Sequence, residues 1–163
     1  MKSLVVYYSF SGNTRKVAKT LGGYLAQYGP VQEIDLAPID PPRSFLGQCQ
    51  EAFWQKKARL AEVSFDCAGY DLVCIGTPVW AFGPAPAVNA FLSKAAGLSG
   101  KRTVLFNTNG GGPGIDRCFR IMRKVLAAKA AVVSLDVPVY QEKAGDKEFV
   151  LKQFAPVAQW IGH

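Results

Sequence analysis

A short segment near the start of the chain, SFSGNT (residues 9–14), is rich in groups that could bind an anion. It supplies hydroxyls and an amide, and its glycine leaves the backbone unshielded. It stands directly before a stretch of helical period that runs from Arg15 to Tyr28. A helix N-terminus has unpaired N–H groups and about half a positive charge, so it attracts phosphate. A simple helix cap needs only one such residue, whereas five are present here: Ser9, Ser11, Gly12, Asn13 and Thr14.

Two further segments have a composition suited to a binding site, TPVWAFGPAP (residues 77–86) and NTNGGGPG (residues 107–114). Each follows an apolar run that is typical of a buried strand. In an open α/β sheet, ligands bind at the carboxyl ends of the strands, where the strand order reverses. We therefore expect all three segments to meet at one edge. Two other interpretations stay open: Trp80 is also consistent with core packing or a partner surface, and the glycine run with a plain flexible loop.

The elements that must position these loops alternate between strand and helix. Five segments rich in apolar and β-branched residues predict strands, at residues 3–8, 31–36, 70–76, 102–107 and 131–137. Three of them are nearly continuous apolar runs, which is typical of strands covered on both faces. The alternation predicts right-handed βαβ units and a parallel sheet between two helical layers.

Helices are predicted from apolar residues at helical spacing. Three stripes fit this pattern: Val17, Leu21, Leu25 and Tyr28; Val88, Phe91, Leu92 and Ala95; Ile115, Phe119, Met122 and Leu126. A last helix is expected to begin near Asp146 as its N-cap, with Pro156 kinking or breaking it. Residues 49–61 fit a helix less well, and the prolines of residues 37–48 predict a loop.

Composition narrows the class of protein. The chain has 163 residues, which suits a single domain over residues 1–163, and a net charge of +7. No apolar run approaches the roughly 20 residues that span a bilayer, so we expect a cytoplasmic protein without membrane insertion. The basic residues are dispersed, and nucleic acid is not expected as a partner. With His163 as the only histidine and four cysteines without a CxxC pair, no metal site is expected and the thiols are interpreted as structural.

At the first loop the residues resemble a known family, the flavodoxins. The loop contains neither GxxxxGK[ST] nor GxGxxG, which argues against nucleoside triphosphate hydrolysis and a dinucleotide fingerprint. The flavodoxin signature is instead matched at every constrained position by Val5, Val6, Tyr7, Ser9, Gly12, Thr14, Ala18 and Leu21. The resemblance implies a flavodoxin-like, doubly wound, five-stranded parallel sheet of order 2-1-3-4-5 in a three-layer α/β/α fold, for which flavodoxin is itself the standard example.

The resemblance also implies FMN as the cofactor and assigns the three loops. Ser9, Ser11, Gly12, Asn13 and Thr14 would hold the phosphate. Thr77, Pro78, Val79 and Trp80 would line the isoalloxazine, with Trp80 stacked on one face. The other side would be approached by Thr108, Asn109, Gly110, Gly111 and Gly112. No residue is singled out as catalytic, because the flavin itself carries the electrons.

The chain departs from the family pattern in charge and in its loops. Flavodoxins are usually acidic, whereas this chain is basic. The family often has a glycine after the stacking tryptophan, whose peptide can flip and hydrogen-bond the reduced ring; here Ala81 follows Trp80, and Gly83 is restrained by Pro84. The third loop has no aromatic residue, which predicts an open flavin face.

Three functions follow as expectations. The first is an FMN-binding electron-transfer protein that exchanges electrons with redox partner proteins. The second is an FMN-dependent reductase that takes hydride from NAD(P)H and reduces a quinone or a similar acceptor. The third is a module of the same fold that binds a non-flavin anion or a protein.

Overall fold

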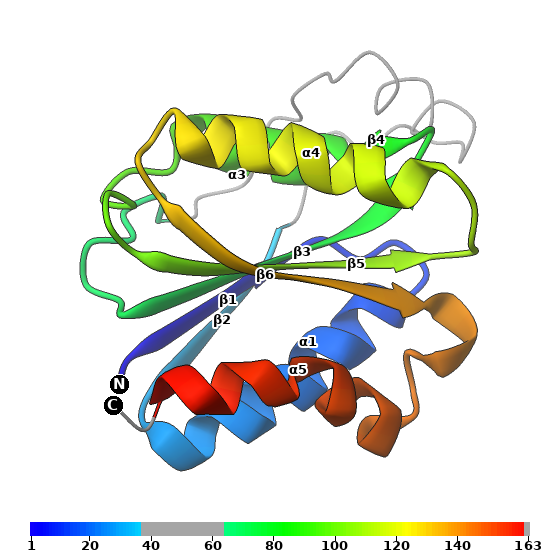
Figure 1. Cartoon of the computed structure of the whole chain (residues 1–163), viewed down its shortest axis with the longest axis horizontal. Coiled ribbons are helices and arrows are strands. Elements are labelled where there is room, and N and C mark those ends of the chain that lie inside the picture. The colour runs from blue at the N-terminus through cyan, green and yellow to red at the C-terminus, as the bar shows by residue number, and fades with distance from the viewer. Residues whose placement is uncertain (37–63, 162–163) are drawn as a thin grey trace.

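Figure 1 shows the computed structural model, which describes residues 1–36 and 64–161. Five parallel strands form the sheet, in the order β2-β1-β3-β5-β6. Their bounds are β1 (Ser3–Tyr7), β2 (Val31–Asp35), β3 (Leu72–Trp80), β5 (Arg102–Asn109) and β6 (Val132–Tyr140). The predicted fold class and strand order are therefore confirmed.

The helices cover both faces of this sheet, as expected for βαβ units. In Figure 1, α3 and α4 lie on one face and α1 and α5 on the other. Their bounds are α1 (Asn13–Leu25), α3 (Pro86–Lys94), α4 (Gly114–Ala127) and α5 (Lys147–Ile161), with 3-10 turns η1 (Ala26–Tyr28) and η2 (Gln141–Lys143). Among the described residues, no helix is long and apolar enough to cross a membrane.

Each face of the sheet has its own apolar core, because the strand side chains alternate between faces. One core joins Ile75 and Leu105 to Phe91 of α3 and Met122 of α4. The members of the second core that lie between the sheet and helices α1 and α5 include Val5, Cys74, Phe106, Leu21, Val150 and Phe154. Both cores are almost completely shielded from solvent. The sheet is thus a fixed platform for the loops at its edges.

The strand β3 is longer than predicted. It continues through Trp80, so residues 77–80 belong to a strand and not to a loop. The cause is a short strand that the sequence did not predict, β4 (Gly83–Pro84), which pairs antiparallel with the end of β3. Only Ala81 and Phe82 connect the two, as a two-residue hairpin turn.

Two expectations concern α5. Asp146 caps this helix as predicted, since its Oδ1 accepts the N–H of Phe149 at 3.0 Å. Pro156 was expected to kink or break the helix, and the break is wrong: α5 continues through Pro156 to residue 161. Phe154 and Val157, on either side of the proline, are fully buried, and their packing holds the helix together. The predicted loop at 37–48 and helix at 49–61 lie outside the described residues.

Candidate functional site

The first loop ends in a glycine turn that leaves backbone donors open. Gly12, at φ +89°, occupies the N-cap position of α1, and as a glycine it has no side chain with which to cap the helix. The N–H of Arg15 is used by the Ser9 hydroxyl at 3.1 Å. The N–H groups of Asn13 and Thr14 have no partner within the part of the chain that the structure describes. Two open donors at a helix N-terminus are suited to an anion.

The hydroxyl of Thr14 has a different environment from the rest of the loop. Thr14 is buried, and its Oγ1 lies 2.7 Å from Oγ1 of Thr108, at the end of β5. This hydrogen bond joins the first and third predicted loops across the sheet edge. It fixes the two loops relative to each other. The expectation that the first and third loops lie together is therefore confirmed.

The predicted residues on β3 are held inward. The Oγ1 of Thr77 accepts the N–H of Ala85 at 2.9 Å and donates to the carbonyl of Pro78, also at 2.9 Å. These bonds connect β3 to the start of α3. Pro78 and Val79 are half-buried. The Thr77 hydroxyl therefore shapes the loop rather than projecting from it.

Trp80 lies in a cluster of aromatic rings. Its indole is 5% exposed and meets the rings of Tyr8 and Phe10 edge-on, at centroid distances of 5.5 and 5.7 Å. Phe10 itself is 52% exposed. The arrangement places Trp80 between the first and second loops, and Phe10 is the ring of this cluster that faces solvent.

The turn after Trp80 is strained. Ala81 and Phe82 have φ values of +43° and +66°, the left-handed region that L-residues seldom adopt. Two such residues in a two-residue hairpin form the turn that glycine and asparagine normally occupy. Such strain is found preferentially at functional sites. It projects Phe82 to 46% exposure beside the end of β3.

The third loop is organised by one buried amide. Asn109 donates from Nδ2 to Oδ1 of Asn107 at 2.9 Å, and its own Oδ1 accepts the N–H of Gly111 at 3.0 Å. Gly110, Gly111 and Gly112 are exposed, and the last two have positive φ. The loop therefore presents bare backbone to solvent.

Asn107 supplies an open donor next to this loop. Its side chain is fully buried, and its Nδ2 has no hydrogen-bond partner among the described groups. It stands opposite Thr77 in the ladder between β5 and β3, and these two residues begin the third and second loop segments. An unpaired buried donor is costly, so an acceptor at this edge would stabilise it. The open N–H groups of α1 suit a phosphate, and the Asn107 amide suits an acceptor on a ring. The residues at this edge therefore fit a phosphorylated ligand with ring acceptors.

Sequence reasoning missed three exposed aromatic residues at this edge: Phe10, Phe82 and Tyr140. Tyr140 pairs with Asn109 at the end of β6 and is 55% exposed. A Cβ placed on Gly111 would lie 3.8 Å from its ring. An aromatic ring thus borders the glycine loop, supplied by the next strand. The signal for Phe10 was an aromatic residue inside a polar loop, and that for Phe82 was an aromatic residue beside glycine and proline.

The tyrosines near the site and the buried cysteines are kept uncharged. Burial, and then the negative charge of Asp35, raises the pKa of the Tyr7 and Tyr8 phenols. Burial also raises the pKa of the Cys67 thiol to about 11 and that of Cys118 further. The three cysteines described are free and buried, as their structural interpretation requires. None of these groups is prepared to act as a nucleophile at neutral pH.

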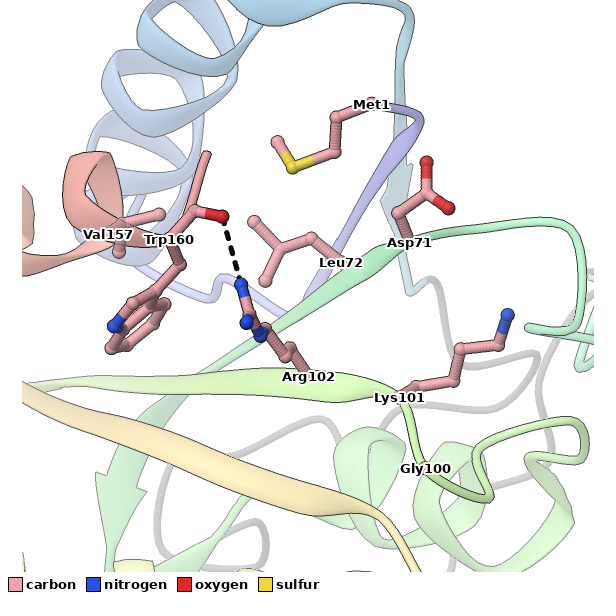
Figure 2. Close-up of a pocket in the computed structure, with 8 residues that line it drawn as sticks. All are labelled: Met1, Asp71, Leu72, Gly100, Lys101, Arg102, Val157 and Trp160. Carbon is pink, nitrogen blue, oxygen red and sulfur yellow. Dashed lines mark hydrogen bonds between the residues drawn. The ribbon is translucent and has the colours of Figure 1, made fainter. Parts of the chain in front are cut away.

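Two cavities help to delimit the site. A cavity of about 450 Å³ lies at the opposite edge, beside Leu72, Arg102 and Trp160 (Figure 2). There Arg102 donates to the Trp160 carbonyl at 2.9 Å, and the amino ends of the strands, not their carboxyl ends, form the wall. A second cavity of about 930 Å³ lies between α1 and α5 and reaches Gly12, with Lys16 and Lys147 on its walls.

The family of the chain is shown by comparison with known proteins. The flavodoxin family profile matches residues 2–135. The chain belongs to the flavodoxin family, and this membership supports the predicted cofactor, FMN. Among curated proteins, no sequence matches the chain.

Solved structures share the fold over nearly the whole chain. A flavodoxin from the domain Archaea is 16% identical, covers 100% of both chains and has a TM-score of 0.66. A flavoprotein from Lactobacillus acidophilus, solved in complex with FMN, is 20% identical over 90% of this chain and 97% of its own, with a TM-score of 0.62. The azoreductase AzrA is 15% identical over 99% of both chains, with a TM-score of 0.58.

Proposed function

We propose that this protein is an FMN-binding electron-transfer protein. The observation that carries the proposal is a set of unpaired donors at one sheet edge: the N–H groups of Asn13 and Thr14, and the buried Nδ2 of Asn107. Family membership and the FMN complex of the Lactobacillus relative support FMN as the group that they receive. FMN, when bound, supplies the storage and transfer of electrons.

The chain's own residues would then bind and orient the cofactor. Ser11, Gly12, Asn13 and Thr14 would hold the phosphate, because they carry or flank the open N–H groups at the start of α1. Residues 77–80 and 108–112 would border the ring. Neither a carrier nor a flavin-dependent reductase needs a catalytic acid or base from the protein, because the bound flavin itself carries the electrons.

The proposal is tested first by the visible spectrum of the purified protein. We expect flavin absorption bands, and an FMN-free preparation should recover them on adding FMN. Controlled reduction should then transfer electrons to a second redox protein without NAD(P)H turnover. A preparation that binds no flavin in the presence of excess FMN would contradict the proposal. It would favour the third expectation, a module of the same fold that binds a non-flavin anion or a protein.

Trp80 provides a second test, because an indole in contact with a flavin ring quenches flavin emission by electron donation. We expect bound FMN in a Trp80→Phe variant to emit several-fold more strongly than in the wild type. Trp160→Phe is the matched control, since Trp160 lies at the opposite edge of the sheet. Equal emission from both variants would show that Trp80 serves only the aromatic cluster with Tyr8 and Phe10.

One observation favours the alternative, an FMN-dependent NAD(P)H reductase. Ala81 and Phe82 fill the turn after Trp80, so a freely flipping glycine is replaced by two residues already in the left-handed region. Loss of a hydrogen bond that forms only on reduction would bring the two one-electron potentials of the cofactor closer together and favour two-electron chemistry. The azoreductase neighbour shows that the fold accommodates a reductase.

An Ala81→Gly variant separates the two functions. One hydrogen bond of about 1 kcal/mol corresponds to about 40 mV for a one-electron step, so we expect glycine to widen the gap between the potentials by about that amount. Potentiometric titration also gives the change in potential per tenfold change in the ratio of oxidised to reduced flavin. This slope is about 59 mV for one-electron steps and about 30 mV for a two-electron step. A wild-type slope near 30 mV with steady NAD(P)H oxidation would establish the reductase.

A further inference from the structure

The outer face of α4 is strongly cationic. Arg117, Arg120 and Lys124 recur at a spacing of three and four residues, which places them on one side of the helix. Arg120 and Lys124 are exposed, whereas Arg117 is half-buried and already has an interaction partner. Arg123 points elsewhere, because its Nε donates to Asp136 of β6 at 2.7 Å. Asp116 is the helix's one acidic residue, so the helix as a whole carries a clear excess of positive charge.

This cationic stripe (Arg117, Arg120 and Lys124) begins beside the candidate cofactor site. α4 follows the glycine loop directly and packs against β4. A Cβ placed on Gly114, its first residue, would lie 3.0 Å from Cα and Cδ1 of Phe82. At 1.5 Å per residue, Arg120 is only about 9 Å along the helix from this contact. Along the helix axis, the stripe therefore begins within one turn of the contact between Gly114 and Phe82.

Phe82 has the properties of an interface anchor. Its ring is 46% exposed, and its backbone is held at φ +66° by the hairpin between β3 and β4. A rigid, exposed aromatic ring loses little conformational freedom on binding, and aromatic and arginine residues are enriched at the centres of protein interfaces. Cations around it add attraction for an acidic surface and increase the association rate.

From this placement, we propose that Phe82 and the stripe of Arg117, Arg120 and Lys124 form the docking surface for a redox partner protein with an acidic face. The proposal rests on the proposed electron-transfer function. Docking here brings the partner to the end of β3 and the glycine loop, next to the predicted flavin ring. The polarity is opposite to that expected for an acidic flavodoxin, so the two kinds of carrier would select different partners.

A protein partner is favoured over nucleic acid by the shape of the surface. The stripe covers eight residues of helix, 117–124, or about 10 Å from its first residue to its last, and begins near an apolar ring. A small protein interface of about 800 Å² per partner covers such an area with an apolar centre and a charged rim. Nucleic acid binding draws its affinity from many phosphate contacts, and three cations around a phenyl ring offer few.

The test measures binding to an immobilised acidic iron–sulfur protein, rubredoxin, with cytochrome c as the basic counterpart and an oligo(dT) strand as the nucleic acid probe. We expect rubredoxin to bind most tightly, with an affinity that falls as salt is added. An Arg120→Glu/Lys124→Glu variant should weaken that binding about tenfold or more at low salt, because two attractions become repulsions. Phe82→Asn keeps a residue tolerant of positive φ and should weaken binding without changing the salt dependence.

The matched control is Lys2→Glu/Lys152→Glu, which changes net charge by the same amount at two exposed positions away from the stripe, one before β1 and one on α5. It should weaken rubredoxin binding less than threefold. Equal weakening by both charge reversals, or tighter binding to cytochrome c or oligo(dT), would overturn the proposal. Binding is measured with and without FMN, and FMN affinity is measured separately in each variant. A failure to bind FMN thus counts against the proposed function. The effect of the charge reversals on rubredoxin binding tests the docking surface separately.

Discussion

FMN binding is expected to weaken by about 3–6 kcal/mol, or roughly 10²- to 10⁴-fold, in an Asn13→Ala/Thr14→Val variant. The physical reason is the charge of the phosphate: each hydrogen bond to a charged group contributes about 1.5–3 kcal/mol, and the variant removes the Asn13 amide and the Thr14 hydroxyl. Riboflavin, which has no phosphate, should bind to the variant within about threefold of the wild type. Fluorescence titration of the flavin-free protein with both ligands measures the difference.

The buried bond between Thr14 and Thr108 makes the riboflavin comparison decisive. If the Thr14 hydroxyl only joins the two loops, its loss disturbs the ring site as much as the phosphate site, and both ligands weaken equally. Equal weakening would therefore contradict the phosphate assignment. Thr20→Val is the matched control on α1, because its hydroxyl donates to the Lys16 carbonyl at 3.0 Å, away from the loop.

The order of the sheet was predictable because it depends on features that a sequence records directly. Nearly continuous apolar runs predicted strands covered on both faces, and β1 and the first six residues of β3 are indeed buried throughout. The β3–β4 hairpin was not predictable in this way, since Ala81 and Phe82 are not the residues of a tight turn. Pairing of Trp80 with Gly83 stabilises a conformation that local propensity opposes.

The candidate site was predictable in composition but not in orientation. Serine, threonine and asparagine after predicted strands indicated polar loops, yet the pattern cannot say which way a hydroxyl points. The Thr77 hydroxyl points inward and accepts the Ala85 N–H, and the Asn109 side chain holds the glycine loop by accepting the Gly111 N–H. Tyr140 reaches that loop only because β6 pairs with β5, a contact across about thirty residues of sequence. Such roles depend on tertiary pairing, which no local pattern contains.

The stability of the platform depends on a glycine directly before the second loop. A Cβ placed on Gly76 would lie 2.1 Å from Cζ of Phe106 and 2.2 Å from its Cε2. Phe106 is fully buried, and its ring meets that of Phe154 at a centroid distance of 5.8 Å, so it has little space to move. Because position 76 has no side chain, the Phe106 ring can lie over β3 and β5, in the core between the sheet and helices α1 and α5.

A Gly76→Ala variant is accordingly expected to lose about 3 kcal/mol of unfolding free energy, the upper part of the usual range for an overpacked core. Urea denaturation of the flavin-free protein measures this loss. Phe106→Leu shortens the opposing side chain, so the double variant should be more stable than the sum of the single effects predicts, by at least about 1 kcal/mol. Strictly additive losses would show that the Gly76 backbone, and not the contact with Phe106, sets the cost. Because Gly76 adjoins Thr77, FMN affinity should fall in Gly76→Ala and recover in the double variant.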